Sequence, residues 1–283
     1  MRCTHTRKLH VYKTEDPIEV PCGKCMPCRI QRTGEWTTRL TLESFKHKES
    51  CFITLTYSDA FLPSDYGLHK YHLQKFIKRL RFFLGKRKVK HYSVGEYGDK
   101  TGRPHYHLLC FGWYPADIYV YMFKGKTKVF SSSELDNLWP YGANTVGVVE
   151  PRSINYVTGY IRKKLYGRKG LEVYGLRQPP FQLSSQNLGV TYAFENRQKI
   201  IDDSGIILQG KNLGIPRYFF NKLMLGEEFK IKRLKELSLR MDKHREERGI
   251  GLMENIREFK DDAVQREKDL LSKDKLFGGS KIL

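Results

Sequence analysis

The stretch from His91 to Trp113, HYSVGEYGDKTGRPHYHLLCFGW, restricts the possible folds more than any other part of this 283-residue chain. Two runs rich in aromatic and aliphatic residues flank GDKTGRP, whose glycines, aspartate and proline are typical of a turn. The stretch therefore predicts an antiparallel hairpin. If the turn is centred between residues 100 and 101, residues whose numbers sum to 201 face each other, so Glu96 pairs with His105.

The same hairpin collects three side chains that suit a metal ion. His105 and His107 are two residues apart in a strand, so both point to one face, and Glu96 lies opposite on that face. Two imidazoles and one carboxylate fit a divalent cation that acts as a Lewis acid, and we predict Mn²⁺ or Mg²⁺. The alternative is a half-buried strand with two hydrogen-bonded histidines and no metal.

A second motif, SINYVTGYIRKKL, covers residues 153–165 and predicts a helix with Ser153 as its N-cap. At 100° per residue, Tyr156 and Tyr160 fall away from the apolar stripe, so we expect both tyrosines to avoid the packing face. They are four residues apart and therefore neighbours on one face, with Lys163 and Lys164 just behind. The alternative is a pair of surface aromatics on a basic helix. The stripe consists of Ile154, Val157, Ile161 and Leu165.

Three segments resemble, in order, the three motifs of the HUH rolling-circle replication initiators. They are FITLTY (Phe52 to Tyr57), PHYHLL (Pro104 to Leu109) and YVTGYIRKK (Tyr156 to Lys164). The Tyr-x3-Tyr form resembles the two-tyrosine branch used by small single-stranded DNA phages. The segment PCGKCMPCR and the chain length further resemble the initiators of microviruses, specifically gokushoviruses.

The resemblance implies an enzyme that nicks a single-stranded DNA origin. Glu96, His105 and His107 would hold the metal on the scissile phosphate, and Tyr160 or Tyr156 would attack, with Tyr160 favoured as the first nucleophile. Lys163 or Lys164 would stabilise the phenolate or the phosphoryl charge. The products are a 5′-phosphotyrosine link and a free 3′-OH, which later rejoins the ends without any nucleotide cofactor. A host helicase and polymerase are the expected further partners.

The charge of the chain also indicates a polyanionic partner. The formal net charge is +20, and residues 226–283 hold 15 basic and 13 acidic side chains, so nearly all of the excess lies before them. The segment Tyr114 to Phe130 interleaves aromatics with lysines and is expected to clamp single-stranded bases, unless it is an ordinary loop or hairpin beside the sheet. The residues expected to bind DNA are Arg103, Arg162, Lys126 and Lys128.

Six cysteines are present, and four of them have the spacing of a metal site. Cys22, Cys25 and Cys28 follow C-x2-C-x2-C, with Cys3 upstream as the fourth thiolate. We predict a closed, structural Zn²⁺ site from these four residues. An iron–sulfur cluster is the main alternative, and reduced structural thiols are the third. The remaining two cysteines, at 51 and 110, lie in predicted strands and are expected in the core.

Several classes of protein are excluded by what the chain lacks. No secretory signal and no apolar run of membrane-spanning length is present, so we expect a cytoplasmic protein, in the host bacterium if the source is viral, with no membrane partner. Gly205 to Asn212 has the spacing of a phosphate-binding loop, but Asn212 replaces the Ser or Thr that ligates Mg²⁺. We therefore expect no ATPase module.

The predicted fold is α+β, a ferredoxin-like split βαβ HUH endonuclease domain with a central antiparallel sheet. The predicted elements are a helix over 29–46, a strand over 51–57, a helix over 69–84, the hairpin, a helix over 131–139, a strand over 144–150 and the tyrosine helix. Four regions follow: a Cys-rich knuckle plus helix (1–48), the catalytic domain (49–170), a basic extension packed on it (171–225) and a charged helical C-terminal arm (226–283). Within the third region, Gly167 to Phe181 marks a linker rich in Gly and Pro.

Two other functions remain open from the sequence alone. A single-tyrosine HUH transposase or relaxase would use one tyrosine and leave Tyr156 structural. A zinc-containing single-stranded DNA-binding protein without chemistry would use the sheet and the basic helix as a platform. The binding protein has no need of Glu96, His105 and His107 opposite a tyrosine helix, which favours the enzymes.

Overall fold

The computed structural model describes residues 3–10, 17–165, 167–208, 210–223 and 225–226, and the isolated positions 229, 239, 243, 265, 268, 269 and 272. Contacts divide the chain into two compact units. We call Arg39–Tyr192 the sheet unit, and Met1–Thr38 with Ala193–Leu283 the cysteine unit. The predicted C-terminal arm, apart from the isolated positions, lies outside the described residues. The four predicted regions remain predictions.

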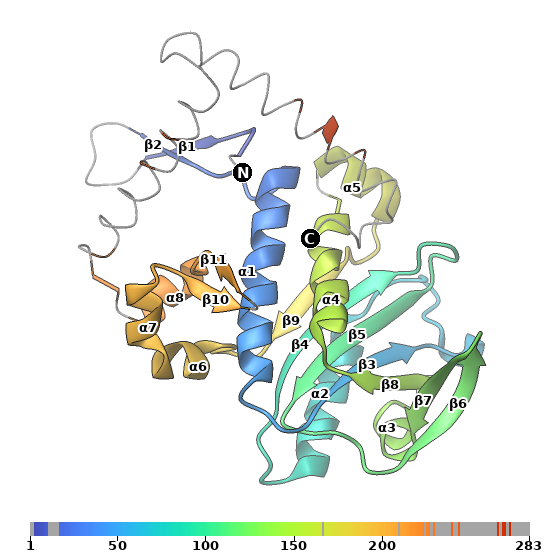
Figure 1. Ribbon diagram of the computed structural model, residues 1–283. Coiled ribbons are helices and arrows are strands. Elements are labelled where there is room, and N and C mark those ends of the chain that lie inside the picture. The colour runs from blue at the N-terminus through green and yellow to red at the C-terminus, as the bar shows by residue number, and fades with distance from the viewer. Residues whose placement is uncertain are drawn as a thin grey trace. The chain divides into compact units, whose positions relative to one another are not determined.

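The sheet unit contains a seven-stranded sheet in which all neighbours are antiparallel, so the structure is α+β (Figure 1). The strand order is β6-β7-β8-β3-β5-β4-β9. The strands are β3 (Ser50–Thr56), β4 (Lys90–Tyr97), β5 (Pro104–Phe111), β6 (Ile118–Lys124), β7 (Thr127–Ser132), β8 (Asn144–Val148) and β9 (Phe181–Ser184). The helices of this unit are η1, a 3₁₀ turn (Asp59–Phe61), α2 (Lys70–Leu84), α3 (Ser133–Leu138), α4 (Pro151–Lys163) and α5 (Gly167–Tyr174).

The cysteine unit is built from short elements. Its strands pair into two separate two-stranded ribbons, β1 with β2 and β10 with β11. These strands are β1 (Arg7–Leu9), β2 (Ile18–Val20), β10 (Ile206–Leu208) and β11 (Lys211–Leu213), and the helices α7 (Arg197–Asp202) and α8 (Arg217–Lys222) accompany them. The boundaries between the units fall inside α1 (Met26–Ser44) and α6 (Val190–Glu195).

The main core lies between one face of the sheet and helices α2 and α3. Alternate residues of β3 are buried there, because successive side chains of a strand point to opposite faces. Helix α2 contributes its apolar stripe to the same core. The cluster includes Cys51, Ile53, Leu55, Leu73, Phe76, Ile77, Leu80, Tyr106, Leu108, Cys110, Leu135, Trp139 and Val146. Both strand cysteines are fully buried, as the sequence predicted.

The hairpin between β4 and β5 has the predicted register. Glu96 is paired with His105, and Val94 with His107. The turn is closed by the N–H of Gly98, which donates to the carbonyl of Arg103 over 2.9 Å. Gly102 has φ +65°, a left-handed conformation that glycine adopts without steric cost. Turn chemistry visible in the sequence therefore set the alignment of the two strands.

Two local predictions are wrong. Ser153 is not the N-cap of α4: the helix begins after Glu150, and the Ser153 hydroxyl accepts the Glu150 N–H over 2.9 Å, a reversed capping arrangement. The region predicted as a linker contains helix α5, because residues 167–174 hold an amphipathic pattern between their glycines. Among the described residues, no helix combines the length and apolarity that crossing a bilayer requires.

Candidate functional site

Two strands and one helix build the candidate site. His105 and His107 lie on the face of β5 opposite to Tyr106 and Leu108, which belong to the main core. Helix α4 covers this second face, over β4 and β5 (Figure 1). The sheet therefore has its core helices on one side, and the histidines with the tyrosine helix on the other.

The predicted metal ligands converge within this face. His105 Nε2 lies 2.7 Å and His107 Nε2 3.2 Å from the same carboxylate oxygen, Glu96 Oε1. One ligand atom from each of the three residues lies within 4.8 Å of the others. Glu96 and His107 are buried, and His105 is partly exposed. Two ring nitrogens and a carboxylate oxygen aimed at one point fit a divalent cation with coordination positions left open.

Neighbouring groups orient both imidazoles for this role. The Nδ1 of His105 lies 3.2 Å from the Arg103 carbonyl, which can only accept, so this nitrogen donates its proton and Nε2 keeps a free lone pair. The Nδ1 of His107 lies 3.0 Å from the hydroxyl of Thr54 on β3. A donor role for that Nδ1 leaves Nε2 of His107 free as well. Such partners commonly fix the tautomer of metal-binding histidines.

The protonation of the site suits metal binding. Burial acts to raise the pKa of Glu96, but the hydrogen bonds with His105 and His107 outweigh it and hold this pKa below its ordinary value. Burial lowers the pKa of His107, with a smaller opposing effect from Glu96. Near neutral pH the carboxylate is therefore ionised and His107 is neutral, which are the forms that bind cations.

Both tyrosines of α4 lie next to His107. The Tyr160 ring stacks on the His107 ring at 5.4 Å with an interplanar angle of 11°, and its hydroxyl is 3.4 Å from Nε2. The Tyr156 ring meets the His107 ring edge-on at 5.2 Å and the Tyr160 ring at 5.2 Å. The structure thus brings the predicted nucleophiles and the predicted metal ligands together.

One expectation about these tyrosines was wrong. Tyr156 is 42% exposed, but Tyr160 is only 7% exposed and lies against the sheet. The apolar stripe of Ile154, Val157 and Ile161 is buried as predicted. Eight of the thirteen residues of α4 are buried, so the helix packs over more than one face, and a single apolar stripe underestimates the buried arc.

The electrostatics of the site oppose ionisation of the phenols. Burial and the charge of Glu96 raise the pKa of Tyr160, and burial raises the pKa of Tyr156. The Nζ of Lys163 lies 5.1 Å from the centre of the Tyr160 ring and 2.8 Å from Asp99 Oδ2, in the hairpin turn. Lys163 counteracts part of the rise at Tyr156. Lys164, which ends α4, is partly buried.

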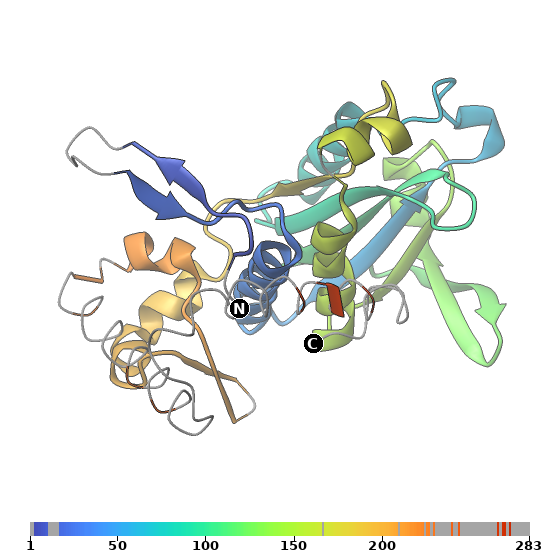
Figure 2. The same cartoon turned by 90° about the horizontal axis from the view of Figure 1, so that it is seen from above.

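The residues predicted to bind DNA divide into two groups. Lys126 and Lys128 are exposed in the β6–β7 hairpin, which Figure 2 shows reaching away from the rest of the sheet. Arg103 is partly exposed, but its guanidinium donates to Asp59 and to the Tyr57 carbonyl. Arg162 is only 3% exposed, so the expectation that it forms a surface contact with DNA is corrected, because α4 buries that side of its last turn.

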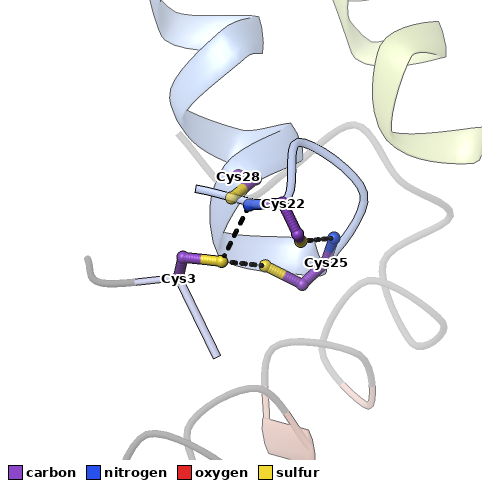
Figure 3. A group of neighbouring side chains, drawn as sticks. All are labelled: Cys3, Cys22, Cys25 and Cys28. Carbon is purple, nitrogen blue, oxygen red and sulfur yellow. Dashed lines mark hydrogen bonds between the residues drawn. The ribbon is translucent and has the colours of Figure 1, made fainter. Parts of the chain in front are cut away.

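The four predicted cysteines form a second cluster, in the cysteine unit (Figure 3). One sulfur atom from each of Cys3, Cys22, Cys25 and Cys28 lies within 4.8 Å of the others. The N–H groups of Lys24 and Cys25 both donate to the Cys22 sulfur over 3.3 Å, and the Cys22 N–H donates to the Cys3 sulfur. Sulfur atoms that face one another and accept backbone N–H bonds suit a tetrahedral metal.

The thiols of this cluster titrate unequally. Burial acts to raise the pKa of Cys25, but hydrogen bonds from the Cys28 backbone and from Thr4 outweigh it and lower that pKa to about 6. Burial is the main cause that raises the pKa of Cys28 and of Cys3. One thiolate among protonated neighbours is the start of a metal site, since binding then displaces the remaining protons.

The segment that imitates a phosphate-binding loop has a different structure. The residues on either side of position 209 form strands β10 and β11, paired from Ile206 with Leu213 to Leu208 with Lys211. A phosphate-binding loop of this spacing leads from a strand into a helix. The rejection of an ATPase module at this segment agrees with the hairpin.

Three residues of the site were missed by the sequence analysis. Thr54 faces His107 across β3 and β5, Phe52 stacks on the His107 ring at 5.6 Å, and Asp99 pairs with Lys163. The first two depend on pairing between strands separated by 53 residues, for which the sequence carries no turn signal. The segment FITLTY contained both residues, but their positions relative to His107 required the register of the sheet.

Comparisons with known proteins place the same segments in one family. The family described as "Replication-associated protein ORF2" matches residues 50–165, which run from β3 to just after α4. The protein of that same name from Spiroplasma virus 4 is 32% identical over 220 residues, which cover 72% of this chain and 67% of the relative.

Two further relatives carry similar names. "Replication-associated protein ORF4" of Chlamydia phage 1 is 34% identical over 210 residues, and "Replication-associated protein VP4" of Bdellovibrio phage phiMH2K is 38% identical over 153. The alignments cover 71% and 51% of this chain, but only 52% and 48% of those relatives, so the chain spans about half of their length. No solved structure matches the chain.

Proposed function

Because the chain belongs to the family of microvirus replication-associated proteins, we propose that it initiates rolling-circle replication by nicking a single-stranded DNA origin. The observation that carries this proposal is the contact of Tyr160 with His107, next to Glu96 and His105. A nucleophile beside a ready cation site is what phosphodiester transfer requires. The strand order β8-β3-β5-β4, with its helical crossovers, also supports the ferredoxin-like HUH fold.

The three convergent residues hold Mn²⁺ or Mg²⁺ in this proposal. The bound ion supplies Lewis-acid polarisation of the scissile phosphate. The chain supplies the orientation: Thr54 and the Arg103 carbonyl keep both Nε2 atoms directed at Glu96. The burial of Glu96 and His107 keeps competing water away from two of the three ligands.

A tyrosine of α4 performs the cut. Its phenolic oxygen attacks the phosphorus, the bond from phosphorus to the 3′ oxygen breaks, and a 5′-phosphotyrosine forms. The phenol loses its proton and the leaving 3′ oxygen gains one, so the step is balanced. Because burial keeps the phenols protonated, attack needs nearby positive charge, and Lys163 is placed to provide it. Lys164 is the second candidate for this role.

The two tyrosines act in turn. Tyr160 attacks first, since its hydroxyl is the one that lies 3.4 Å from His107 Nε2. Tyr156, on the next turn and in contact with the Tyr160 ring, cuts the regenerated origin while the first link persists. A free 3′-OH then attacks the phosphotyrosine and rejoins the DNA. The bond energy stays in the ester, so joining uses no nucleotide cofactor.

Other components of this reading follow from the chemistry. The origin strand would be held by the basic surface that includes Arg103, Lys126 and Lys128, by contacts with phosphate groups. Unwinding and synthesis would be left to a host helicase and polymerase, in the bacterial cytoplasm. These partners are proposals of the same reading.

The four cysteines hold a structural Zn²⁺ in this proposal. Four thiolates fill all positions of a tetrahedral ion, and none is left for a reaction. The Cys25 thiol, whose pKa is lowered to about 6, binds without a large proton penalty. An iron–sulfur cluster needs the same four ligands, so metal analysis of the purified protein separates the two.

A single-tyrosine enzyme is the second candidate. It is favoured by the unequal burial of the tyrosines, since Tyr160 alone is enclosed against His107 while Tyr156 is 42% exposed. In that reading Tyr156 is structural. Joining by the Tyr156→Phe variant would then proceed normally.

The test uses labelled single-stranded DNA that carries a candidate origin, with Mn²⁺ or with chelator. We expect a denaturant-resistant protein–DNA adduct that needs Mn²⁺, persists in each single Tyr→Phe variant, and disappears in the double variant and in His107→Ala. Tyr121→Phe is the matched control, because Tyr121 is 43% exposed on β6 and belongs to no candidate site for cutting. Tight binding without any adduct would instead indicate a DNA-binding protein without chemistry.

A further inference from the structure

Helix α2 presents a solvent-exposed stripe on the side of the sheet opposite to α4. Its inner face fills the main core with Leu73, Phe76 and Leu80. Its outer face carries residues at positions i, i+4, i+7 and i+11, which lie within about 60° of one another around the helix. The stripe consists of Tyr71, Lys75, Lys78 and Phe82, all exposed.

The stripe combines large rings with positive charge. Tyr71 is 58% and Phe82 is 90% exposed, although an exposed phenylalanine loses the benefit of burial. The Nζ of Lys75 lies 4.4 Å from the centre of the Tyr71 ring. Arg79 and Arg81 flank the stripe on either side. Between Asp65 and Glu96 the chain contains nine basic residues and no acidic one.

We propose that this stripe is a second binding surface for single-stranded nucleic acid, separate from the one that carries the cut strand. Exposed rings stack on bases, and neighbouring ammonium groups contact phosphates. The stripe is about 16 Å long, from eleven residues at 1.5 Å each, which is enough for several nucleotides. The inference rests on the proposed function only in that DNA is taken as the ligand.

The charge of the surface favours nucleic acid over other occupants. A second copy of this chain would bring a net charge of +20 toward a surface that is itself basic. An anionic membrane would satisfy the lysines, but the apolar face of α2 is already in the core, and an interfacial helix inserts that face. Single-stranded nucleic acid uses both the rings and the lysines.

Because the stripe and the Glu96 site lie on opposite faces of one sheet, a strand on α2 is not the strand against Tyr160. The surface would retain an uncut segment of DNA while the other face holds the origin. This would keep the enzyme near its substrate between successive cuts, by raising the effective concentration of linked DNA.

The test measures binding of a labelled oligothymidylate by the full chain without added divalent ions, so no adduct formation is needed. We expect Tyr71→Ala with Phe82→Ala to weaken binding roughly tenfold. Replacing both rings by the other aromatic residue, Tyr71→Phe with Phe82→Tyr, should restore it. An abasic oligonucleotide of equal length should bind more weakly to the wild type, and equally to the wild type and the Ala variant.

The lysines have a separate readout. Lys75→Gln with Lys78→Gln should reduce the slope of log affinity against log salt by about 1.4, since each phosphate contact contributes about 0.7 for single strands. The matched controls remove the same groups from the cysteine unit: Lys199→Gln with Lys222→Gln, and Phe194→Ala, whose ring is 58% exposed. These should leave affinity and slope unchanged.

Direct mapping completes the test. Single-stranded DNA containing 5-iodouracil, irradiated on the protein, should form cross-links at Tyr71 or Phe82. Unchanged affinity and salt slope in both α2 variants would overturn the proposal. So would self-association or binding to anionic vesicles that Phe82→Ala abolishes while DNA binding stays intact. Loss of the adduct in the double tyrosine variant tests the proposed function independently, and the α2 variants should still cut a short origin oligonucleotide.

Discussion

The two candidate metal sites are built from the same kind of ligand cluster but are supported in different ways. Glu96, His105 and His107 project from β4 and β5, strands of eight residues that each have a partner on both sides. The four cysteines lie at the start of α1 and beside the three-residue strands β1 and β2. The first site is held by a sheet, and the second by very little besides itself.

Their cores show the same contrast. Below the Glu96 face lies a cluster of aliphatic and aromatic side chains that stabilises the sheet whether or not an ion is bound. The buried cluster around the cysteines consists of Cys22, Cys25 and Cys28, packed against Cys3. We infer that the first site preorganises its ion, while in the second the ion organises the chain.

The largest predicted effect is therefore at the cysteines. We expect Cys25→Ser to abolish zinc binding and to unfold the segment around β1, β2 and the start of α1, because structural zinc supplies about 10–16 kcal/mol in small zinc domains. Metal analysis and hydrogen exchange would measure this. Cys110→Ala is the matched control: it should destabilise the sheet but keep the zinc. Protein purified without zinc or iron would end the prediction.

Next in size is the effect of His107→Ala on the sheet unit. We expect Mn²⁺ affinity to fall by at least about 100-fold, since replacing even an indirect partner of a ligand costs 10- to 100-fold. The sheet should remain folded, because its strands do not depend on the ion. Calorimetric titration with Mn²⁺ and far-UV circular dichroism would test both parts. Unfolding of the sheet in this variant would contradict the contrast between the two sites.

A third prediction concerns acid and the sheet unit alone. Burial lowers the pKa of His91 on β4 from 6.5 to about 4, so the unfolded chain binds a proton more readily than the folded one between these values. Stability should therefore fall as the pH drops from 6.5 to 4, by about 3 kcal/mol in total. His91→Asn should flatten urea-denaturation midpoints in this window. An equally steep pH dependence in that variant would assign the effect to other groups.

The smallest predicted effect is at Thr54. Its hydroxyl lies 3.0 Å from His107 Nδ1 and acts as a positioning residue. Thr54→Val keeps the shape and removes the hydroxyl, so Mn²⁺ affinity should fall between about 10- and 100-fold. Thr54→Ser should restore it. Equal affinities of the Val and Ser variants, measured by titration, would show that the hydroxyl has no part in orienting the imidazole.

Local patterns in the sequence predicted much of the site. Glu96 and His105 were paired correctly because the turn GDKTGRP determines the register of a hairpin. The four cysteines were grouped by their spacing and do lie together. The helix with Tyr156 and Tyr160 was expected, and it lies beside the histidines. Each of these predictions used residues that are close in the chain or share one turn.

The rest depended on contacts between distant segments. Tyr160 and Arg162 were expected on the surface, and both are buried, because α4 packs over more than one face. Thr54 was not identified, because its pairing with His107 depends on two strands without a common turn. No periodicity in one helix or strand states how many of its sides will be covered.

The sequence alone determined which groups are available: the Glu-His-His set, the tyrosine pair, the four thiols and the basic surface. The tertiary structure decided which of them meet, which tyrosine is enclosed, and which cations remain free to reach a polyanion. The physical reason is range. Turn chemistry and side-chain periodicity act over a few residues, whereas burial and hydrogen bonding across strands arise only when the whole sheet has formed.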